Sequence, residues 1–304
     1  MAAVPTQPVG ALPTPPASQT PVPSGPPPGN YYLSEGLEGV EHQQYLDGPS
    51  FTRAIESLAG KLCSGNWSDG QYVVFSSVTQ ANLTHLNKIH NTRYKGLRFL
   101  YLNDEQVLVV KIVAGLIHES ASQHLGDILK LKLVQMGAQG EIYNVGTTTF
   151  KGGNSRKEAD CAFKPWMSRS RATDWPTLVI ECGIWESRAR LKVDSCWWLQ
   201  NSGGKVKIVL LLAISKAEKK IRLEQWEMAS GPNPEGAQSP PDPLRVVPKR
   251  IHRLDIVEGV AAGPPFTLDF NKIFLHRPGP HQSDIVLTAE DLSQYATHIW
   301  RGAK

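Results

Sequence analysis

The spacing of apolar residues predicts a regular succession of helices and strands in the middle of the chain. Residues 118–136 repeat apolar side chains every three or four positions, as an amphipathic helix does, and Gly137 is placed to end it. Residues 187–201 are expected to form a second helix. Strands are expected on either side of it, at residues 141–150, 158–163, 177–183 and 206–214. The predicted order is therefore helix, three strands, helix, strand.

The flanking segments show weaker patterns of the same two kinds. Residues 50–62 have a helical spacing and residues 69–80 include a strand-like run. Two apolar runs, 97–102 and 106–113, are separated by a turn-prone Asn-Asp-Glu sequence, which predicts a hairpin. Residues 289–300 again follow a helical period. The pattern as a whole indicates a mixed α+β protein.

Proline divides the chain into segments. Residues 1–30 hold 10 of the 23 prolines and are expected to be a disordered tail, because they cannot bury enough apolar surface to offset the entropy of ordering. Residues 31–230 are predicted to form an α/β domain with its core at about 116–228. Six prolines mark residues 231–248 as a loop or linker. Residues 249–304 are expected to pack back on the core.

Composition and charge narrow the classes of partner only slightly. A formal net charge of +4 permits a nucleic-acid partner without requiring one. No apolar run is long enough for a membrane span and no secretory signal is evident, so we expect an intracellular protein without a membrane partner, nuclear or cytoplasmic. The proline-rich tail could bind a domain that recognises polyproline II helices. The sequence does not indicate an oligomeric state.

Two acidic residues lie within the predicted strands of the core. Asp160 follows Glu158 and Ala159 on one strand, and Glu181 ends an apolar run on the next. Acids inside a sheet are costly to desolvate unless they are paired, bind a cation or face a cleft. If the two strands are neighbours, Asp160 and Glu181 converge, and a divalent cation such as Mg²⁺ or Mn²⁺ would relieve their repulsion and activate water.

These acids carry a resemblance to a known family. The segments that carry it are Lys157-Glu158-Ala159-Asp160, residues 175–187 (WPTLVIECGIWES), Asp194, Trp197-Trp198, Asn201-Ser202 and residues 206–211 (VKIVLL). This pattern resembles the PD-(D/E)XK restriction-endonuclease-like superfamily, and most of all Uma-type endonucleases and uncharacterised fungal proteins. The resemblance implies an αβββαβ core, a central mixed sheet flanked by helices, with N- and C-terminal additions here. It also implies Mg²⁺-dependent or Mn²⁺-dependent hydrolysis of nucleic acid, with Asp160 and Glu181 as metal ligands.

The chain departs from the family pattern at the lysine of the E-x-K motif. Gly183 stands at that position, so the cation that would orient the nucleophile is missing from the strand. Some members supply it from the following helix, which makes Lys192 the candidate here, with Arg188 one turn earlier as a further one. Alternatively, Arg188, Arg190 and Lys192 only solvate the outer face of the helix, with Arg190 pairing to Asp194.

Two more acids remain open to more than one interpretation. Glu158 would either add a metal ligand or pair with Lys157 or Arg156. Glu119 would match the acid that many members place on their first core helix, although the helix dipole favours an acid in a first turn in any case. The adjacent pair Trp197 and Trp198 is expected to pack in the core rather than to stack on bases.

Two functions follow from these observations. One is a metal-dependent nuclease that uses Asp160, Glu181 and Lys192. The other is a catalytically inactive descendant of the same fold that acts as a binding or scaffolding module, as the loss of lysine at Gly183 suggests. A fold alone does not establish an activity.

Overall fold

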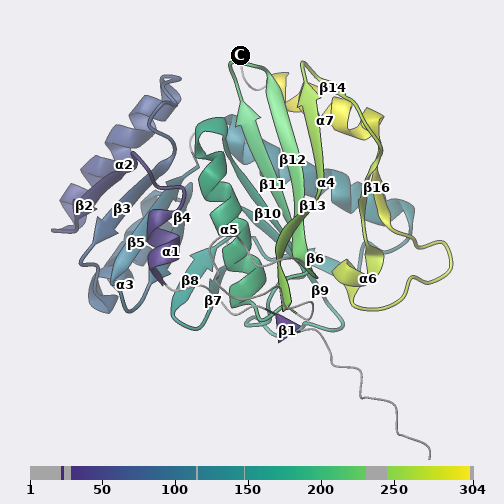
Figure 1. Cartoon of the computed structure of the whole chain (residues 1–304), viewed down its shortest axis with the longest axis horizontal. Coiled ribbons are helices and arrows are strands. Elements are labelled where there is room, and N and C mark those ends of the chain that lie inside the picture. Colours follow the sequence, from purple (N-terminus) through teal and green to yellow (C-terminus); the bar gives the residue numbers. More distant parts are fainter. Residues whose placement is uncertain (1–21, 24–28, 114–115, 147, 231–244, 302–304) are drawn as a thin grey trace, which may run out of the picture.

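Two β-sheets and the helices around them make up the fold of the computed structural model, which describes residues 22–23, 29–113, 116–146, 148–230 and 245–301 (Figure 1). Sheet A has the strand order β1-β13-β12-β11-β10-β9-β6, with β14 paired to β13. Its strands are β1 (Val22–Pro23), β6 (Ile142–Asn144), β9 (Cys161–Pro165), β10 (Leu178–Ile184), β11 (Ile208–Ser215), β12 (Lys220–Ser230), β13 (Arg245–Val257) and β14 (Val260–Ala261). Since β10 and β11 run parallel while β9 and β12 run antiparallel to them, sheet A is mixed.

Sheet B is built mainly from the N-terminal part of the chain, in the strand order β2-β3-β5-β4-β8-β7. Its strands are β2 (Glu41–Gln44), β3 (Tyr72–Ser76), β4 (Leu97–Leu102), β5 (Val107–Ile112), β7 (Thr149–Lys151) and β8 (Ser155–Glu158). Strands β4 and β5 form the expected hairpin. A separate pair is formed by β15 (Phe266–Leu268) and β16 (Ile285–Leu287).

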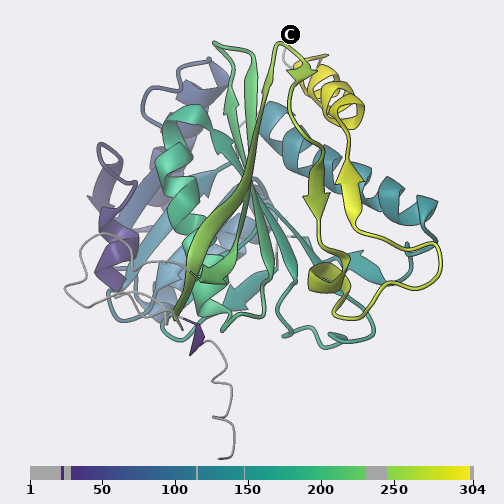
Figure 2. The ribbon, with the colours of Figure 1, turned by 45° about the vertical axis from the view of Figure 1, so that its right-hand side comes forward.

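The helices lie in three layers around the two sheets. They are α1 (Gly29–Ser34), α2 (Gly48–Cys63), α3 (Gln80–Arg93), α4 (Leu116–Gln135), the short 3-10 helix η1 (Trp185–Ser187), α5 (Arg188–Asn201), α6 (Phe270–Phe274) and α7 (Ala289–Arg301). Helices α2 and α3 pack on the outer face of sheet B, and α4 and α7 cover the outer face of sheet A. Helix α5 lies between the two sheets (Figures 1 and 2).

Local sequence explains the ends of the two long helices. Asp47 caps α2, since its side chain accepts from the backbone N–H of Ser50 at 2.7 Å while the Ser50 hydroxyl lies 3.2 Å from the Asp47 N–H. Gly137 follows α4 with φ of +68°, a left-handed conformation that glycine adopts without a steric penalty. The helix predicted at residues 118–136 is therefore confirmed.

The fold-class prediction is confirmed. A central mixed sheet is flanked by α4 on one face and α5 on the other, and within sheet A the expected order appears as α4, β6, β9, β10, α5 and β11. Strands β7 and β8 lie between β6 and β9 in the chain and belong to sheet B, so the prediction of one strand over residues 141–150 is wrong. Strand β13 begins at Arg245, inside the segment expected to be a loop, while the rest of that segment and most of the proline-rich tail lie outside the described residues. None of the described helices has the length and apolar character that crossing a membrane requires.

Candidate functional site

The two predicted acids approach each other where the chain passes from one sheet to the other. Strand β8 ends in sheet B at Glu158, and β9 begins in sheet A at Cys161, so Asp160 lies at the crossing. The prediction of one continuous strand over residues 158–163 is therefore wrong. Because Cys161 pairs with Ile180 on the antiparallel strand β10, Asp160 is brought next to Glu181.

A lysine from the other sheet lies between these acids. Lys111, on β5, places its ammonium nitrogen 2.6 Å from Asp160 Oδ2 and 2.8 Å from Glu181 Oε2. The exposed fractions of the three side chains are 2%, 1% and 0%. Sequence reasoning missed Lys111, although a lone cation in the apolar run VLVVKI was a usable signal, because a buried ammonium needs a counter-charge.

A second lysine and two aromatic donors complete the surroundings of Glu181 and Asp194. Lys157 Nζ lies 3.4 Å from Glu181 Oε1 and 3.3 Å from Asp194 Oδ1. The indole N–H of Trp198 donates to Glu181 Oε1 at 2.7 Å, and the Tyr72 hydroxyl donates to Asp194 Oδ2 at 3.0 Å. Both carboxylates are therefore held by charged and neutral donors.

Two arginines form further ion pairs with these acids, one with Asp160 and one with Asp194. Arg98 Nε lies 3.4 Å from Asp160 Oδ1, and the backbone N–H of Cys182 donates to Asp160 Oδ2 at 2.7 Å. Arg190 Nε lies 3.4 Å from Asp194 Oδ1, which confirms the expected pairing on α5. We call the seven charged side chains the ionic cluster: Arg98, Lys111, Lys157, Arg190, Asp160, Glu181 and Asp194. Each of them is at most 8% exposed.

Burial and charge act in opposite directions on the pKa values of this cluster. Burial alone would lower the pKa of Lys111, but the carboxylates of Asp160 and Glu181 outweigh it and hold that pKa well above the ordinary value. Burial raises the pKa of Glu181, and the ammonium groups of Lys111 and Lys157 oppose this rise. For Asp194, burial is outweighed by Lys157 and Arg190, so its pKa is lowered. The two acids thus favour the charged form of Lys111.

The acid pair does not present a metal site in this arrangement. Both Asp160 and Glu181 already accept hydrogen bonds from Lys111, and the backbone of Cys182 and the indole of Trp198 add one more each. A divalent cation needs carboxylate oxygens that face it directly. Among the residues that the structure describes, no group of three or more His, Cys, Asp or Glu side chains is arranged to hold a metal ion. Binding of Mg²⁺ by Asp160 and Glu181 stays a prediction.

The predicted cations lie elsewhere. Lys192 and Arg188 are both exposed and line a groove beside α5, while the cation that contacts both acids is Lys111. The space beside Gly183, where the motif would have its lysine, is occupied by neighbouring side chains. A Cβ added at Gly183 would lie 3.1 Å from both Leu191 methyl groups and 3.3 Å from the Gln71 side-chain oxygen. A side chain at this strand position would therefore require Leu191 and Gln71 to shift.

The remaining candidates do not join the acid pair. Glu158 accepts from the backbone N–H of Phe99 at 3.0 Å and the Thr149 hydroxyl at 3.1 Å, and it lies 3.8 Å from His90 Nε2. The ion-pair partner of Glu158 in the described structure is His90, so the alternative in which Glu158 pairs with Lys157 or Arg156 is wrong. The side chain of Glu119 is outside the described residues.

Two further predictions concern α5. Trp197 and Trp198 are fully buried, as expected of packing residues. Arg190 was expected on the solvated face of the helix, and this is wrong. Its side chain is fully buried and donates to the backbone oxygens of Tyr32 and Glu35 in the N-terminal segment.

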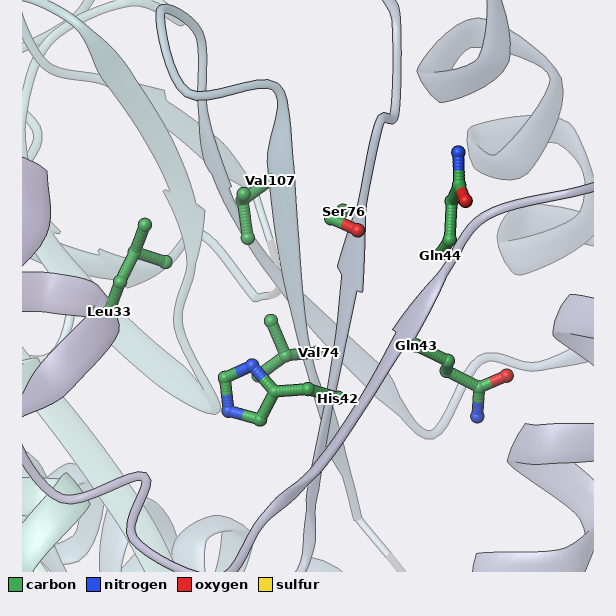
Figure 3. A pocket seen from close by; sticks show the side chains of 7 residues that line it. All are labelled: Leu33, His42, Gln43, Gln44, Val74, Ser76 and Val107. Atoms are coloured by element: carbon green, nitrogen blue, oxygen red, sulfur yellow. The ribbon is translucent and has the colours of Figure 1, made fainter.

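A pocket at the edge of sheet B is a separate feature (Figure 3). It is lined by Leu33, His42, Gln43, Gln44, Val74, Ser76 and Val107. Figure 3 shows the His42 ring beside Val74, with Gln43 on the other side of strand β2. This pocket contains no acid and none of the predicted site residues, so it offers no chemistry related to the ionic cluster.

Comparisons with known proteins give little beyond this geometry. A scan against protein families found no match, and a search of curated proteins found none either. Among solved structures, the chain is similar to "a putative nuclease belonging to DUF820" from Anabaena variabilis ATCC 29413. The TM-score is 0.38 and the identity 11%, over 65% of this chain and 90% of that one. A likeness this distant supports no statement about the site.

Proposed function

We propose that this chain is a catalytically inactive nuclease-like fold that acts as a binding or scaffolding module. The observation that carries the proposal is the ammonium group of Lys111, which lies within hydrogen-bonding distance of both Asp160 and Glu181 in a closed interior. The two acids are the residues that the family resemblance implies as metal ligands. In this chain they hold two sheets together instead.

Hydrolysis of a phosphodiester makes demands that the closed cluster does not meet. The reaction requires a water molecule, a scissile phosphate and a cation to reach the carboxylates at the same time. Asp160 and Glu181 are 1% and 0% exposed, and sheet B covers them through Lys111 and Lys157. Opening the site would separate these ion pairs and leave buried charges without partners, at a cost of about 3–5 kcal/mol for one such pair.

The convergence of Asp160, Glu181 and a lysine favours a second candidate, the metal-dependent nuclease. A lysine next to two acids is the set of groups that the E-x-K motif implies, and Lys111 would supply from β5 the cation that Gly183 lacks on β10. In that case Lys111, rather than Lys192, would face the phosphate. This function would require sheet B to move away from the acids and Mg²⁺ or Mn²⁺ to enter between them.

A cleavage assay separates the two candidates. The full-length chain would be incubated with single-stranded and double-stranded DNA and RNA in the presence of Mg²⁺ or Mn²⁺. Asp160→Asn and Glu181→Gln would be purified in parallel, with Glu158→Gln as a control that changes a buried carboxyl outside the cluster. We expect no cleavage by the wild type. Cleavage that is lost in Asp160→Asn and Glu181→Gln but kept in Glu158→Gln would show that the chain is a nuclease. Equal cleavage by all four preparations would indicate a contaminating enzyme.

A further inference from the structure

A strongly basic groove lies on the side of α5 that faces away from sheet B. It is lined by Arg188 and Lys192 of α5, Arg222 of β12, Arg250 and Arg253 of β13, with Leu191, Leu211, Ala213 and Glu224. The cavity volume is about 170 Å³. Five of these side chains are cations and one is an acid. The positions of Arg188 and Lys192 differ from those of Arg190 and Asp194 by half a helical turn, so α5 separates the groove from the ionic cluster.

The pairing of β12 with β13 brings the three arginines of the groove to one face. Arg222 lies opposite Asp255, and Glu224 lies opposite Arg253. Because side chains alternate along a strand, Arg222 and Glu224 point to the same side of sheet A, and so do their partners on β13. This is the side on which α5 packs. The cations therefore converge on one cavity from a helix and two strands.

An acid beside the groove fixes two of the guanidinium groups. Asp255 accepts from Arg222 Nε at 2.7 Å and Nη2 at 2.9 Å, and from Arg253 Nη2 at 3.2 Å. The bond to Arg222 is the main cause that lowers the pKa of Asp255. A guanidinium has five N–H donors, so both arginines keep donors for a ligand after these bonds. Such prior positioning reduces the entropy lost on binding.

The charge in the groove is only partly balanced. Glu224 lies 3.4 Å from Arg250 and accepts from the indole N–H of Trp226 at 2.9 Å. In the described part of the chain, Arg188 and Lys192 form no ion pair with an acid. Since α5 begins at Arg188, the positive end of its dipole also borders the groove. An anionic ligand would supply the missing negative charge.

The shape of the groove and the nearby aromatic ring distinguish a compact anion from a nucleic acid strand. A cavity of about 170 Å³ lies below the roughly 300–1,000 Å³ of sites for drug-sized ligands, so only a compact ligand, or the phosphate groups of one, can enter it. A single-stranded nucleic acid usually stacks its bases on free aromatic faces. Here the Trp185 ring is already approached by Arg188, Lys220 and Arg222, with distances of 4.6–4.9 Å to its centroid. The ring orients cations and is not free for a base.

We propose that this groove binds a compact, polyphosphorylated small molecule. Several phosphate groups on one small scaffold would contact cations from α5, β12 and β13 at once, and guanidinium groups bind phosphate oxygens in pairs. This proposal rests on the proposed function, in which the fold serves as a binding module, and it adds the class of ligand. Its failure would leave the inactivity of the ionic cluster untouched, because the cleavage assay does not involve the groove.

The probe for this proposal is inositol hexakisphosphate, titrated into the full-length chain by calorimetry at low and moderate NaCl. The test variant is Arg188→Glu combined with Lys192→Glu. The matched control reverses two exposed cations on the far side of sheet B, Arg53→Glu on α2 and Lys88→Glu on α3. Both double variants lose the same charge from exposed helical positions. Thermal unfolding would verify that both remain folded.

We expect wild type and control to bind one equivalent of the probe with similar affinity. The groove variant should bind about a hundredfold more weakly, because each charge-assisted contact contributes about a factor of ten. Absence of binding by the wild type, or equal weakening in the control, would overturn the proposal. Tighter binding of a single-stranded oligonucleotide than of the probe, with the same loss in the groove variant, would overturn it in favour of a nucleic-acid site.

Discussion

Replacing Lys111 with methionine removes the ammonium group from between Asp160 and Glu181 and keeps an apolar stem of similar length. The loss leaves two buried carboxylates with fewer donors, and removing one partner of a buried ion pair costs about 3–5 kcal/mol. Glu181 keeps Lys157 and the Trp198 indole as partners. We therefore expect the lower end of this range, about 3 kcal/mol of unfolding free energy at neutral pH. This is a large part of the roughly 5–15 kcal/mol that stabilises a domain.

The loss should depend on pH in a defined direction. Burial raises the pKa of Glu181, and Lys111 is the largest opposing influence, so the pKa rises further when Lys111 is absent. A carboxyl group with a higher pKa in the folded than in the unfolded state binds more protons when folded. The unfolding free energy then falls as the pH rises from the unfolded pKa through the folded pKa. The deficit of Lys111→Met should accordingly be smaller in acid and larger at alkaline pH.

Urea unfolding followed by tryptophan fluorescence at pH 5 and pH 8 measures both effects. Lys130→Met serves as the control, because Lys130 forms an exposed ion pair with Asp127 on α4, with a side chain 49% exposed. Such pairs contribute about 0.3–0.5 kcal/mol. A loss of stability in Lys111→Met no greater than in the control, or one that does not grow between pH 5 and pH 8, would contradict the role assigned to Lys111.

Two further substitutions test contacts of α5. Trp198→Phe removes the indole donor to Glu181 and should lower the unfolding free energy by about 1–3 kcal/mol; an unchanged urea midpoint would show that the donor is dispensable. Gly36 has φ of +69°, and an added Cβ would lie 2.6 Å from the backbone nitrogen of Arg190 at the start of α5. Gly36→Ala should therefore be more destabilising than Gly39→Ala, where φ is +76° and no atom lies within 4 Å. Equal thermal shifts would mean that only backbone strain matters at position 36.

Much of the core could be predicted from the sequence because buried strands and helices have local signatures. The mainly apolar sequences of β10, which contains Glu181, and of β11 are typical of parallel strands covered on both faces. The period of α4 and the turn between β4 and β5 are equally local. The convergence of Asp160 and Glu181 also followed from the sequence, since it needed only two neighbouring strands.

The second sheet could not be predicted in this way. An apolar pattern indicates that a segment is a strand but not which strand pairs with it. The chain changes sheets between Glu158 and Cys161, within a segment whose pattern fits one strand, and this change puts Glu158 and Asp160 in different surroundings. Lys111 is 49 and 70 residues away from its two acidic partners, so only the tertiary fold brings them together.

The close packing at Gly183 and the burial of Lys111 both arise from the layers that cover β10. Helix α5 lies between two sheets, so Leu191 packs directly over β10 and makes close contacts at position 183. The same covering sheet removes Asp160 and Glu181 from water, which makes an internal counter-charge necessary. Strand β5 of that sheet provides it through Lys111. The sheet that covers the acid pair thus also supplies its counter-charge, which supports the proposed structural use of the two acids.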